Sequence, residues 1–229
     1  MAAVRPVIQP IEVNFSLKGK IYDALKQAIT SMNIYADAEE PRLDERRLSQ
    51  ELGVSRTPIR EAMARLEQEG LLRIVPRKGA FVVRKTKKEI LEMITVWAAL
   101  ESMAARLITL CAGDEEISTL RKMFATFRNS RVQANIDEYS EANIRFHQAL
   151  LKMSHCDLLN EIAESMFIHI RSIRMRTISE SNRATRSIID HMNIIEALER
   201  RDTELAERLV RQHTLDLAAH VERNVHYLD

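Results

Sequence analysis

The chain between residues 43 and 72 reads LDERRLSQELGVSRTPIREAMARLEQEGLL, and it contains two short segments with helical signals. Asp44 is a suitable N-cap for a first helix over ERRLSQEL, which Gly53 can end in the left-handed conformation. Ser55 is a suitable N-cap for a second helix over residues 56–69. Two helices joined by a short turn that contains glycine predict a helix-turn-helix.

The flanking residues complete this module. Residues 18–34 have apolar side chains at helical spacing and predict a preceding helix. The runs LLRIV (71–75) and AFVV (80–83) are typical of short strands, and PRKG (76–79) is typical of the turn between them. Three helices and a β-hairpin predict a winged helix-turn-helix domain over residues 15–85.

The second helix of the pair carries side chains suited to reading DNA. Arg56 and Arg60 are four residues apart and share a face near the N-terminal end, which enters the major groove in such motifs. An arginine can bind both O6 and N7 of a guanine, whereas hydroxyl groups bind phosphates or base edges. The alternative is a basic face that contacts only solvent. The predicted DNA-binding residues are Arg46, Ser55, Arg56, Thr57, Arg60, Lys78 and Gly79.

Residues 43–72 resemble the winged-helix signature of the GntR family of bacterial transcription regulators. GVSRTPIREA (53–62) is the most specific part of the resemblance, and KGAFV (78–82) matches the wing. The resemblance covers about a third of the chain. It implies DNA contacts at the seven residues just named, a homodimer and a palindromic operator in double-stranded DNA.

Charge is distributed unevenly along the chain. Residues 1–85 contain 15 Lys/Arg and 11 Asp/Glu, whereas residues 86–229 contain 19 and 22. This suggests a nucleic-acid-binding module attached to another domain, although a difference of this size is also common by chance. Thr86 and Glu89 have the spacing of a capping box, so a second domain is expected over residues 86–229. Residues 1–14 contain two prolines and predict a flexible arm.

The composition of the whole chain excludes several classes of protein. Its 229 residues have a formal net charge of +1, which excludes a uniformly basic chromatin protein. Five glycines and five prolines disfavour a sheet-rich fold, and no unbroken apolar stretch reaches the ~18 residues of a membrane-spanning helix. Two cysteines are too few for a disulfide framework or a zinc cluster, so we expect reduced core thiols in an intracellular protein. Together with the resemblance, this implies the bacterial cytoplasm.

The remainder of the chain predicts successive helices and almost no strand. One apolar stripe runs from Ile90 to Cys111, and Asp114 and Asn135 are suitable starts for the next two helices. Further helices are predicted at approximately 157–178, 183–200 and 203–226. About six helices indicate an all-α bundle, so the chain as a whole is predicted to be mainly α.

Three of these predicted helices carry histidines that a bundle could bring together. Asn143 and His147 share a helix face, and His191 and His213 lie on two further helices. Three neutral imidazoles and one oxygen ligand suit a divalent ion such as Zn²⁺ or Ni²⁺. From spacing alone, ordinary core or surface histidines are the favoured alternative, and no partner for the second ring nitrogens is identified.

The second part of the chain resembles the FCD effector domain of the FadR-type branch of GntR regulators. The matching stretches are NIRFHQAL (143–150), DHMNIIEALERRD (190–202) and AERLVRQHT (206–214). In metal-binding members these stretches hold one Asp and three His. The resemblance therefore implies an effector-binding and dimerisation domain with a divalent metal, zinc or nickel, whose ligands are Asn143, His147, His191 and His213.

Two positions depart from the family pattern. Asn143 offers a neutral oxygen where an Asp is usual, which is expected to weaken the site or to change its metal. Trp97 stands where an Arg is common, four residues before Glu101. If that Arg binds an acidic effector in relatives, Arg171 and Arg174 are candidate replacements, although a solvated basic edge is the alternative. The predicted effector-binding residues are therefore Trp97, Arg171 and Arg174.

These features predict a sequence-specific transcription regulator rather than an enzyme. The resemblance implies a repressor whose operator affinity is controlled by an organic or sugar acid bound in the metal-containing bundle. The effector would favour one orientation of the two DNA-binding heads in a dimer. A metalloenzyme is a second hypothesis, because three histidines can hold a metal that activates water, but no HExxH motif is present. A non-specific architectural DNA binder is a third, and its affinity would fall steeply with salt.

Overall fold

A computed structural model describes residues 17–37, 39–127, 135–180 and 182–228. Their packing divides them into two compact units. The first comprises the described residues up to Ile29 together with Pro41–Val83, and the second comprises Thr30–Glu40 and the residues from Arg84 onward. The segment Thr30–Glu40 therefore packs with the second unit, although the sequence assigned it to the first domain. The arm predicted over residues 1–14 lies outside the described residues.

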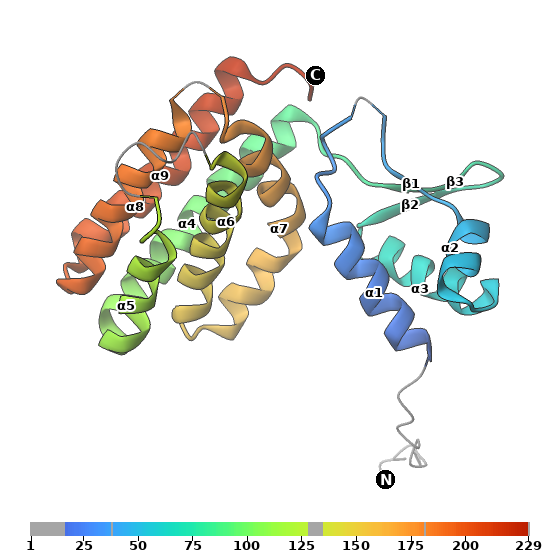
Figure 1. The fold of residues 1–229 in the computed structure, drawn as a ribbon, viewed down its shortest axis with the longest axis horizontal. Helices are drawn as coiled ribbons and strands as arrows, with labels where there is room; N and C mark the ends of the chain where they lie inside the picture. The colour runs from blue at the N-terminus through green and yellow to red at the C-terminus, as the bar shows by residue number, and fades with distance from the viewer. Residues whose placement is uncertain (1–16, 38, 128–134, 181, 229) are drawn as a thin grey trace, which may run out of the picture. The chain divides into compact units, whose positions relative to one another are not determined.

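The first unit is a winged helix-turn-helix, as predicted (Figure 1). Its helices are α1 (Leu17–Ser31), α2 (Glu45–Leu52) and α3 (Arg56–Gln68), and its strands are β1 (Arg42–Leu43), β2 (Leu72–Val75) and β3 (Gly79–Val82). The strands form an antiparallel sheet in the order β1-β3-β2, with Leu72 opposite Val82. The sequence pattern did not indicate β1, because two residues are too few to show a period.

The helix-turn-helix is fixed by the caps that the sequence suggests, with one exception. The Asp44 carboxylate accepts hydrogen bonds from the backbone amides of Arg46 and Arg47 at 2.8 and 2.9 Å. Gly53 ends α2 with a φ of 65°, in the left-handed region that glycine tolerates best. Ser55 occupies the N-cap position of α3, but its side chain makes no capping hydrogen bond. Its hydroxyl is thus not engaged in capping, contrary to the role predicted for it.

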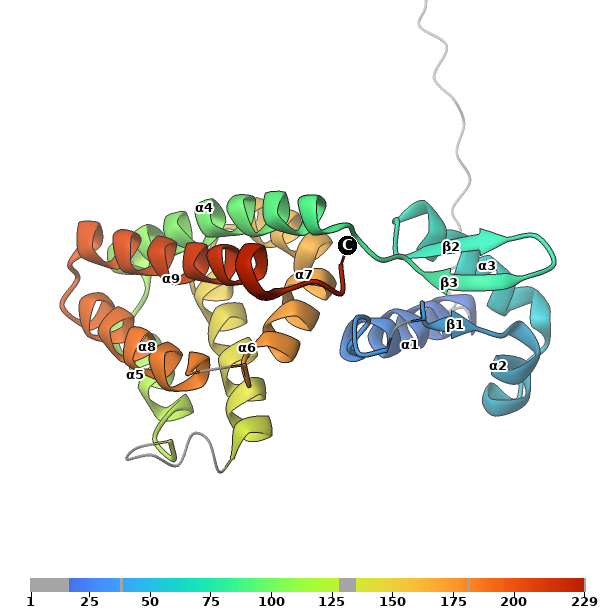
Figure 2. The ribbon, with the colours of Figure 1, turned by 90° about the horizontal axis from the view of Figure 1, so that it is seen from above.

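Six helices make up the described part of the second unit, which confirms the predicted all-α bundle. They are α4 (Lys87–Cys111), α5 (Asp114–Met123), α6 (Ile136–Met153), α7 (Asp157–Thr177), α8 (Arg183–Glu199) and α9 (Thr203–Asn224). Helices α4 and α9 lie side by side, and α4 also contacts α6, α7 and α8 (Figures 1 and 2). Helix α4 is therefore the central element of the bundle.

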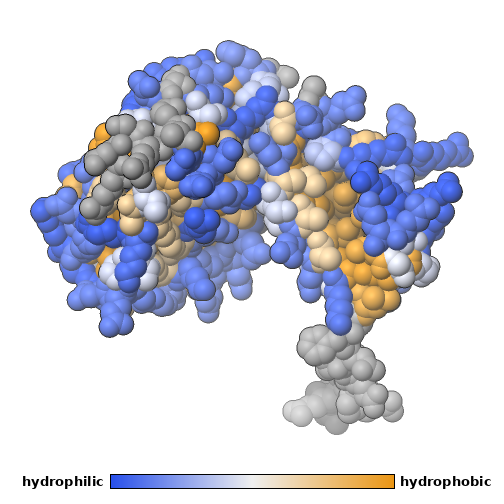
Figure 3. Space-filling model, viewed as in Figure 1, coloured by the Kyte–Doolittle hydropathy of each residue, from blue (hydrophilic) through white to orange (hydrophobic). Residues whose placement is uncertain are grey.

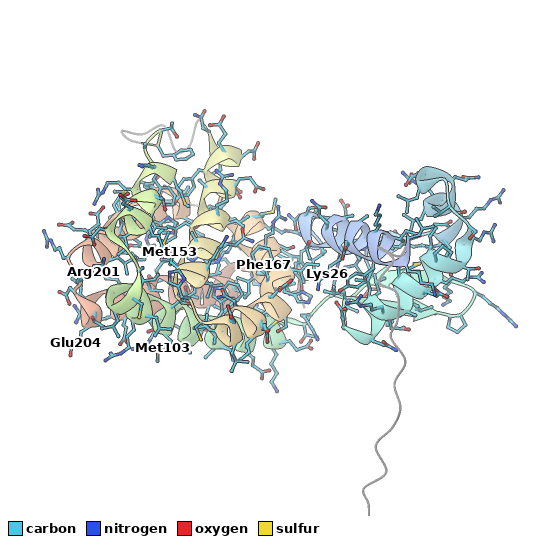
Figure 4. All side chains as sticks on the ribbon, turned by 90° about the horizontal axis from the view of Figure 1, so that it is seen from below. Lys26, Met103, Met153, Phe167, Arg201 and Glu204 are labelled. Atoms are coloured by element: carbon cyan, nitrogen blue, oxygen red, sulfur yellow. The ribbon has the colours of Figure 1, made fainter. Side chains whose placement is uncertain are left out.

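Hydrogen bonds at their ends fix the limits of these helices. The capping box predicted for α4 is present, because the Glu89 carboxylate accepts from the amide of Thr86 at 2.9 Å. Asp114 was predicted to be the N-cap of α5, but the N-cap is Gly113 and Asp114 is the first residue of the helix. The Glu116 carboxylate accepts a hydrogen bond from the amide of Gly113. In the turn between α8 and α9, Arg201 donates to the backbone oxygen of Ile108 at 3.0 Å (Figure 4).

Helix α4 is long and apolar enough to cross a membrane by length and composition, and no other helix among the described residues meets these criteria. Half of its most apolar window is buried inside the unit, where it packs against its neighbouring helices and carries the buried Glu101. This is the pattern of a core helix. On the face drawn in Figure 3, hydrophilic residues cover most of the second unit.

Cys111 is exposed and Cys156 half-buried, so the prediction that both are core residues is wrong.

Candidate functional site

The predicted DNA-binding residues gather at three places on the first unit. Arg46 lies in the first turn of α2; Ser55, Arg56, Thr57 and Arg60 lie at the start of α3; Lys78 and Gly79 lie in the wing. All are exposed except Gly79, which is half-buried. The helix start is where backbone amides and side chains can meet a groove or a phosphate.

A groove of about 610 Å³ runs between the start of α2, helix α3 and the wing. It brings together Arg46, Arg56, Arg60 and Gly79 of the predicted set, whereas Ser55, Thr57 and Lys78 do not line it. Arg77 also lines this groove, although it was not among the residues predicted from the sequence. Its φ of 65° is unusual for a residue other than glycine. The PRKG turn was the available signal, but a lone arginine in a turn is not distinctive.

Two details refine the roles of groove residues. The Nε of Arg60 bonds a carboxylate oxygen of Glu45 at 2.7 Å, so the outer fork of the guanidinium is not part of that ion pair. Gly79 has a φ of 111°, and a Cβ there would lie 2.9 Å from the Nε of Arg42. The flexible end of Arg42 can move aside, so it is the positive φ that favours glycine at residue 79, independently of any close approach by DNA.

The bundle brings the three predicted histidine ligands together, and Asn143 lies one helical turn from His147. Asn143 and His147 lie on α6, His191 on α8 and His213 on α9. One ring nitrogen from each of the three histidines lies within 4.8 Å of the others, and the two Nε2 atoms of His191 and His213 are 3.2 Å apart. The Oδ1 of Asn143 is buried and has no hydrogen-bond partner. An unsatisfied buried oxygen is uncommon, and here it belongs to the predicted oxygen ligand.

The other ring nitrogen of each histidine contacts an oxygen. Nδ1 of His147 lies 2.6 Å from Oε1 of Glu101, and Nδ1 of His213 lies 3.1 Å from Oδ2 of Asp190. Nδ1 of His191 lies 3.4 Å from the hydroxyl of Tyr139. Such contacts set the tautomer and the ring orientation of metal-binding histidines. These partners could not be predicted from the sequence, because all three contacts depend on tertiary packing.

Arg174 joins this cluster from α7. Its Nη1 donates to Nε2 of His147, and its Nη2 lies 3.4 Å from both Glu101 and the hydroxyl of Thr214. Arg174 and Glu101 are both buried. Burial would raise the pKa of Glu101, but His147, Arg174 and the hydrogen bond from Thr214 lower it to about 2. Glu101 is therefore an ionised acceptor, which keeps the proton of His147 on Nδ1.

Burial, and next the positive charge of Arg174, lower the pKa of His147 to about 3. Burial likewise lowers the pKa of His191 well below its ordinary value, because the ring lies among aromatic side chains, with the centroid of Phe146 4.3 Å away. Both imidazoles are thus neutral at pH 7, which is the form that binds a metal. The three imidazoles and the amide oxygen are suitable ligands for a divalent ion. The hydrogen bond from Arg174 to Nε2 of His147 must break before that nitrogen can bind the ion.

The described contacts of the other two predicted effector-binding residues do not include the three histidines. Trp97 is buried and packs near Phe167, with ring centroids 6.4 Å apart. Arg171 donates to the backbone oxygen of Ser31 at 2.7 Å and pairs with Glu141 at 3.2 Å. Of the three predicted residues, Arg174 is the one that forms a described hydrogen bond to a histidine of the cluster.

A winged helix-turn-helix with an arginine-lined groove, followed by a helical bundle with buried histidines, defines a class: DNA-binding regulators with a sensing domain. The family model for bacterial regulatory proteins of the gntR family matches residues 17–82, and the model for the FCD domain matches residues 92–216. The chain belongs to the GntR family of transcription regulators with a C-terminal FCD domain. This is a family of regulators and not of enzymes.

Known proteins agree with this assignment. The HTH-type transcriptional regulator YdhC of Bacillus subtilis is 31% identical over 173 residues, which are 75% of this chain and 77% of YdhC. The gluconate operon transcriptional repressor of Bacillus licheniformis is 28% identical over 187 residues, 79% of this chain and 76% of the repressor. The solved structure of E. coli McbR/YncC has a TM-score of 0.73 at 22% identity, covering 92% of this chain and 99% of that one, which shows a common fold.

Proposed function

We propose that this protein is a homodimeric repressor of the bacterial cytoplasm, which binds a palindromic operator and responds to a carboxylate effector at a metal centre. The observation that carries the proposal is the cluster of three histidines, together with the buried, unpartnered Oδ1 of Asn143 one helical turn before His147 on α6. The repressor names of relatives, including the gluconate operon repressor, support the sign of regulation and an acidic effector.

The DNA-binding role falls on the first unit. We assign base contacts to Arg56 and Arg60, whose side chains line the groove beside the start of α3. Backbone phosphate contacts are assigned to Arg46, Ser55, Thr57, Lys78 and Gly79. Arg77 joins this proposed set because it lines the same groove.

In the second unit, Asn143, His147, His191 and His213 would hold the divalent ion, zinc or nickel. When bound, the ion supplies a Lewis-acidic position that attracts a carboxylate. The chain itself supplies Arg174, a buried cation that can pair with the same carboxylate once it leaves Nε2 of His147. This exchange of partners makes Arg174 the residue that senses the effector.

Helix α7 connects this cluster with the chain that leads to the first unit. Arg174 lies at the cluster, and other residues of α7 hold the segment that follows α1. The amide of Ile34 lies 3.4 Å from Oγ of Ser172, and the hydroxyl of Tyr35 lies 2.9 Å from Nδ1 of His169. A shift of α7 would therefore move residues that continue directly into α1. Such an element, biased by a ligand, is what coupling between two sites requires.

Metal content tests the proposal. Elemental mass spectrometry of the purified protein should find about one divalent ion per chain in the wild type, and none in His147→Ala or His191→Ala. His155→Ala is the matched control, because His155 is exposed and contacts Glu116 outside the cluster. A wild type that takes up no metal from zinc or nickel salts, or loss of metal in the control as well, contradicts the proposed centre.

A further inference from the structure

A second, smaller pocket lies in the bundle between the start of α8 and the C-terminal half of α9. Its volume is about 80 Å³, well below the roughly 300–1,000 Å³ of sites that enclose a whole small molecule. A pocket of this size can hold one ionic group. Its basic lining residues are Arg183, Arg186, Arg223, His213 and His220. We call it the arginine pocket.

The acidic residues of the arginine pocket do not satisfy its cations. Only two carboxylates, Asp190 and Asp216, line it beside the three arginines. Asp190 contacts Nδ1 of His213 at 3.1 Å, and Asp216 accepts from the side-chain amide of Gln212 at 2.8 Å. Glu180, outside the lining, contacts Nε2 of His220 at 2.5 Å, and its negative charge acts on Arg183. All three carboxylates therefore already contact an amide or a histidine, and none forms an ion pair with a guanidinium of the pocket among the described residues.

Arg183 has a buried nitrogen that no other group satisfies, because its Nε has no hydrogen-bond partner. Burial, and then the neighbouring positive charge of Arg174, lower its pKa to about 10. Arg183 is also the first residue of α8, whose N-cap, Asn182, forms no side-chain capping bond. A buried donor without a partner costs free energy, and an anion beside it would remove that cost.

The arginine pocket shares one side chain with the histidine cluster. His213 lines the pocket, while its Nε2 lies 3.2 Å from Nε2 of His191 in the cluster. An anion in the pocket would thus lie beside an imidazole whose opposite edge belongs to the cluster. The imidazole of His213 therefore links the arginine pocket to the histidine cluster, so a charge in one site acts on the other.

We propose that the arginine pocket binds an anionic group, a carboxylate or a phosphate, through Arg183, Arg186 and Arg223. The group is either one end of a larger acidic effector or a free small anion. The anion site is argued only from the residues of the pocket. The further idea that the effector also reaches the histidine cluster rests on the function proposed above.

Isothermal titration calorimetry of the full chain with inorganic phosphate and with succinate tests this site. The main variant is Arg186→Gln/Arg223→Gln, because both side chains are exposed and their loss should not prevent folding. The dissociation constant of at least one probe should rise tenfold or more in this variant. Arg208→Gln is the matched control: it removes the same charge from an exposed position of α9 outside the pocket and should leave binding unchanged.

Further variants separate the possible sources of the anion. Weaker succinate binding in both the double variant and His147→Ala would indicate a ligand that spans the pocket and the cluster. Weaker phosphate binding in the double variant alone would indicate a free anion. Metal content should stay at the wild-type level in the double variant, so failure of the metal centre is distinguishable. The proposal is overturned if the wild type binds neither probe at millimolar concentration, or if the control weakens binding equally.

Discussion

Asn143 differs from a carboxylate ligand by a single atom, and this difference predicts a gain of metal affinity. In Asn143→Asp a charged carboxylate replaces the neutral amide, whose buried Oδ1 has no partner and which lies one helical turn before His147. Because carboxylates are common ligands of divalent ions, the dissociation constant for Zn²⁺ should fall on the order of tenfold or more. Competition with a chromophoric chelator measures this constant. Asn160→Asp, on α7 outside the cluster, is the control, and an equal gain there would contradict a ligand role for Asn143.

Arg60 predicts a sequence-specific effect on DNA binding. Truncation in Arg60→Ala removes a fork that can bind one guanine, so it should cost about 1–3 kcal/mol on the operator and relax the preference at one base pair. Fluorescence anisotropy with the operator and its single-base variants measures both effects. Arg47→Ala is the matched control, since Arg47 is exposed but pairs with Glu51 outside the groove. Unchanged sequence preference in Arg60→Ala would show that Arg60 does not read a base.

At the scale of elements, the buried His169 of α7 makes the stability of the second unit depend on pH. Burial, and then the positive charge of Lys85, lower the pKa of His169 from 6.5 to about 4. The unfolded chain binds this proton near pH 6.5, and the folded chain binds it only near pH 4. The stabilisation is therefore complete above pH 6.5 and is lost as the pH falls toward 4. Between pH 7.5 and 5, His169 accounts for a loss of about 2 kcal/mol.

Urea unfolding followed by tryptophan fluorescence measures this loss. Trp97 is the single tryptophan of the chain and lies in α4, so its emission reports on the second unit. From pH 7.5 to 5, the free energy of unfolding should fall by about 2 kcal/mol more in the wild type than in His169→Gln. The exposed His155→Gln should behave like the wild type. If His169→Gln retains the full pH dependence, His169 is not the neutral buried group described above.

Local signals in the sequence were sufficient for most elements but not for contacts between them. Asp44, Gly53 and the Thr86–Glu89 box act within one helical turn, so a short stretch of sequence predicts them correctly. The start of α5 was misjudged because Gly113 and Asp114 are adjacent and only the backbone geometry decides which residue is the N-cap. The attachment of Thr30–Glu40 to α7 could not be predicted, since its partners are more than a hundred residues away in the chain.

In the candidate site, too, the sequence predicted the positions of residues but not the contacts between helices. The four metal-ligand positions followed from the FCD resemblance, and the bundle brings the three histidine side chains together. Glu101 lies on α4 and Arg174 on α7, and neither has a sequence pattern that points to His147. A buried ion pair of this kind appears in a sequence only as a glutamate and an arginine on apolar helices. Its role depends on which helices pack together, which is a property of the whole bundle.

At the scale of the whole molecule, the proposed mechanism requires two DNA-binding heads. A single start of α3 contacts only one half-site, whereas a dimer reads two half-sites one helical turn, about 34 Å, apart or a multiple of that spacing. Sedimentation velocity should give a mass of about 53 kDa, twice the 26.4 kDa of one chain. A strict monomer at the concentrations used for DNA binding would contradict the two-head mechanism.

The same requirement predicts how the protein distinguishes DNA molecules. On a palindrome obtained by selection from random duplexes, two chains should bind together, and a duplex with one half-site should bind at least tenfold more weakly. Fluorescence anisotropy at several salt concentrations measures both affinities. The preference should persist at moderate salt, because base contacts by Arg56 and Arg60 depend less on released counterions than phosphate contacts do. Equal affinity for the palindrome, the half-site and an unrelated duplex would instead identify a non-specific DNA binder.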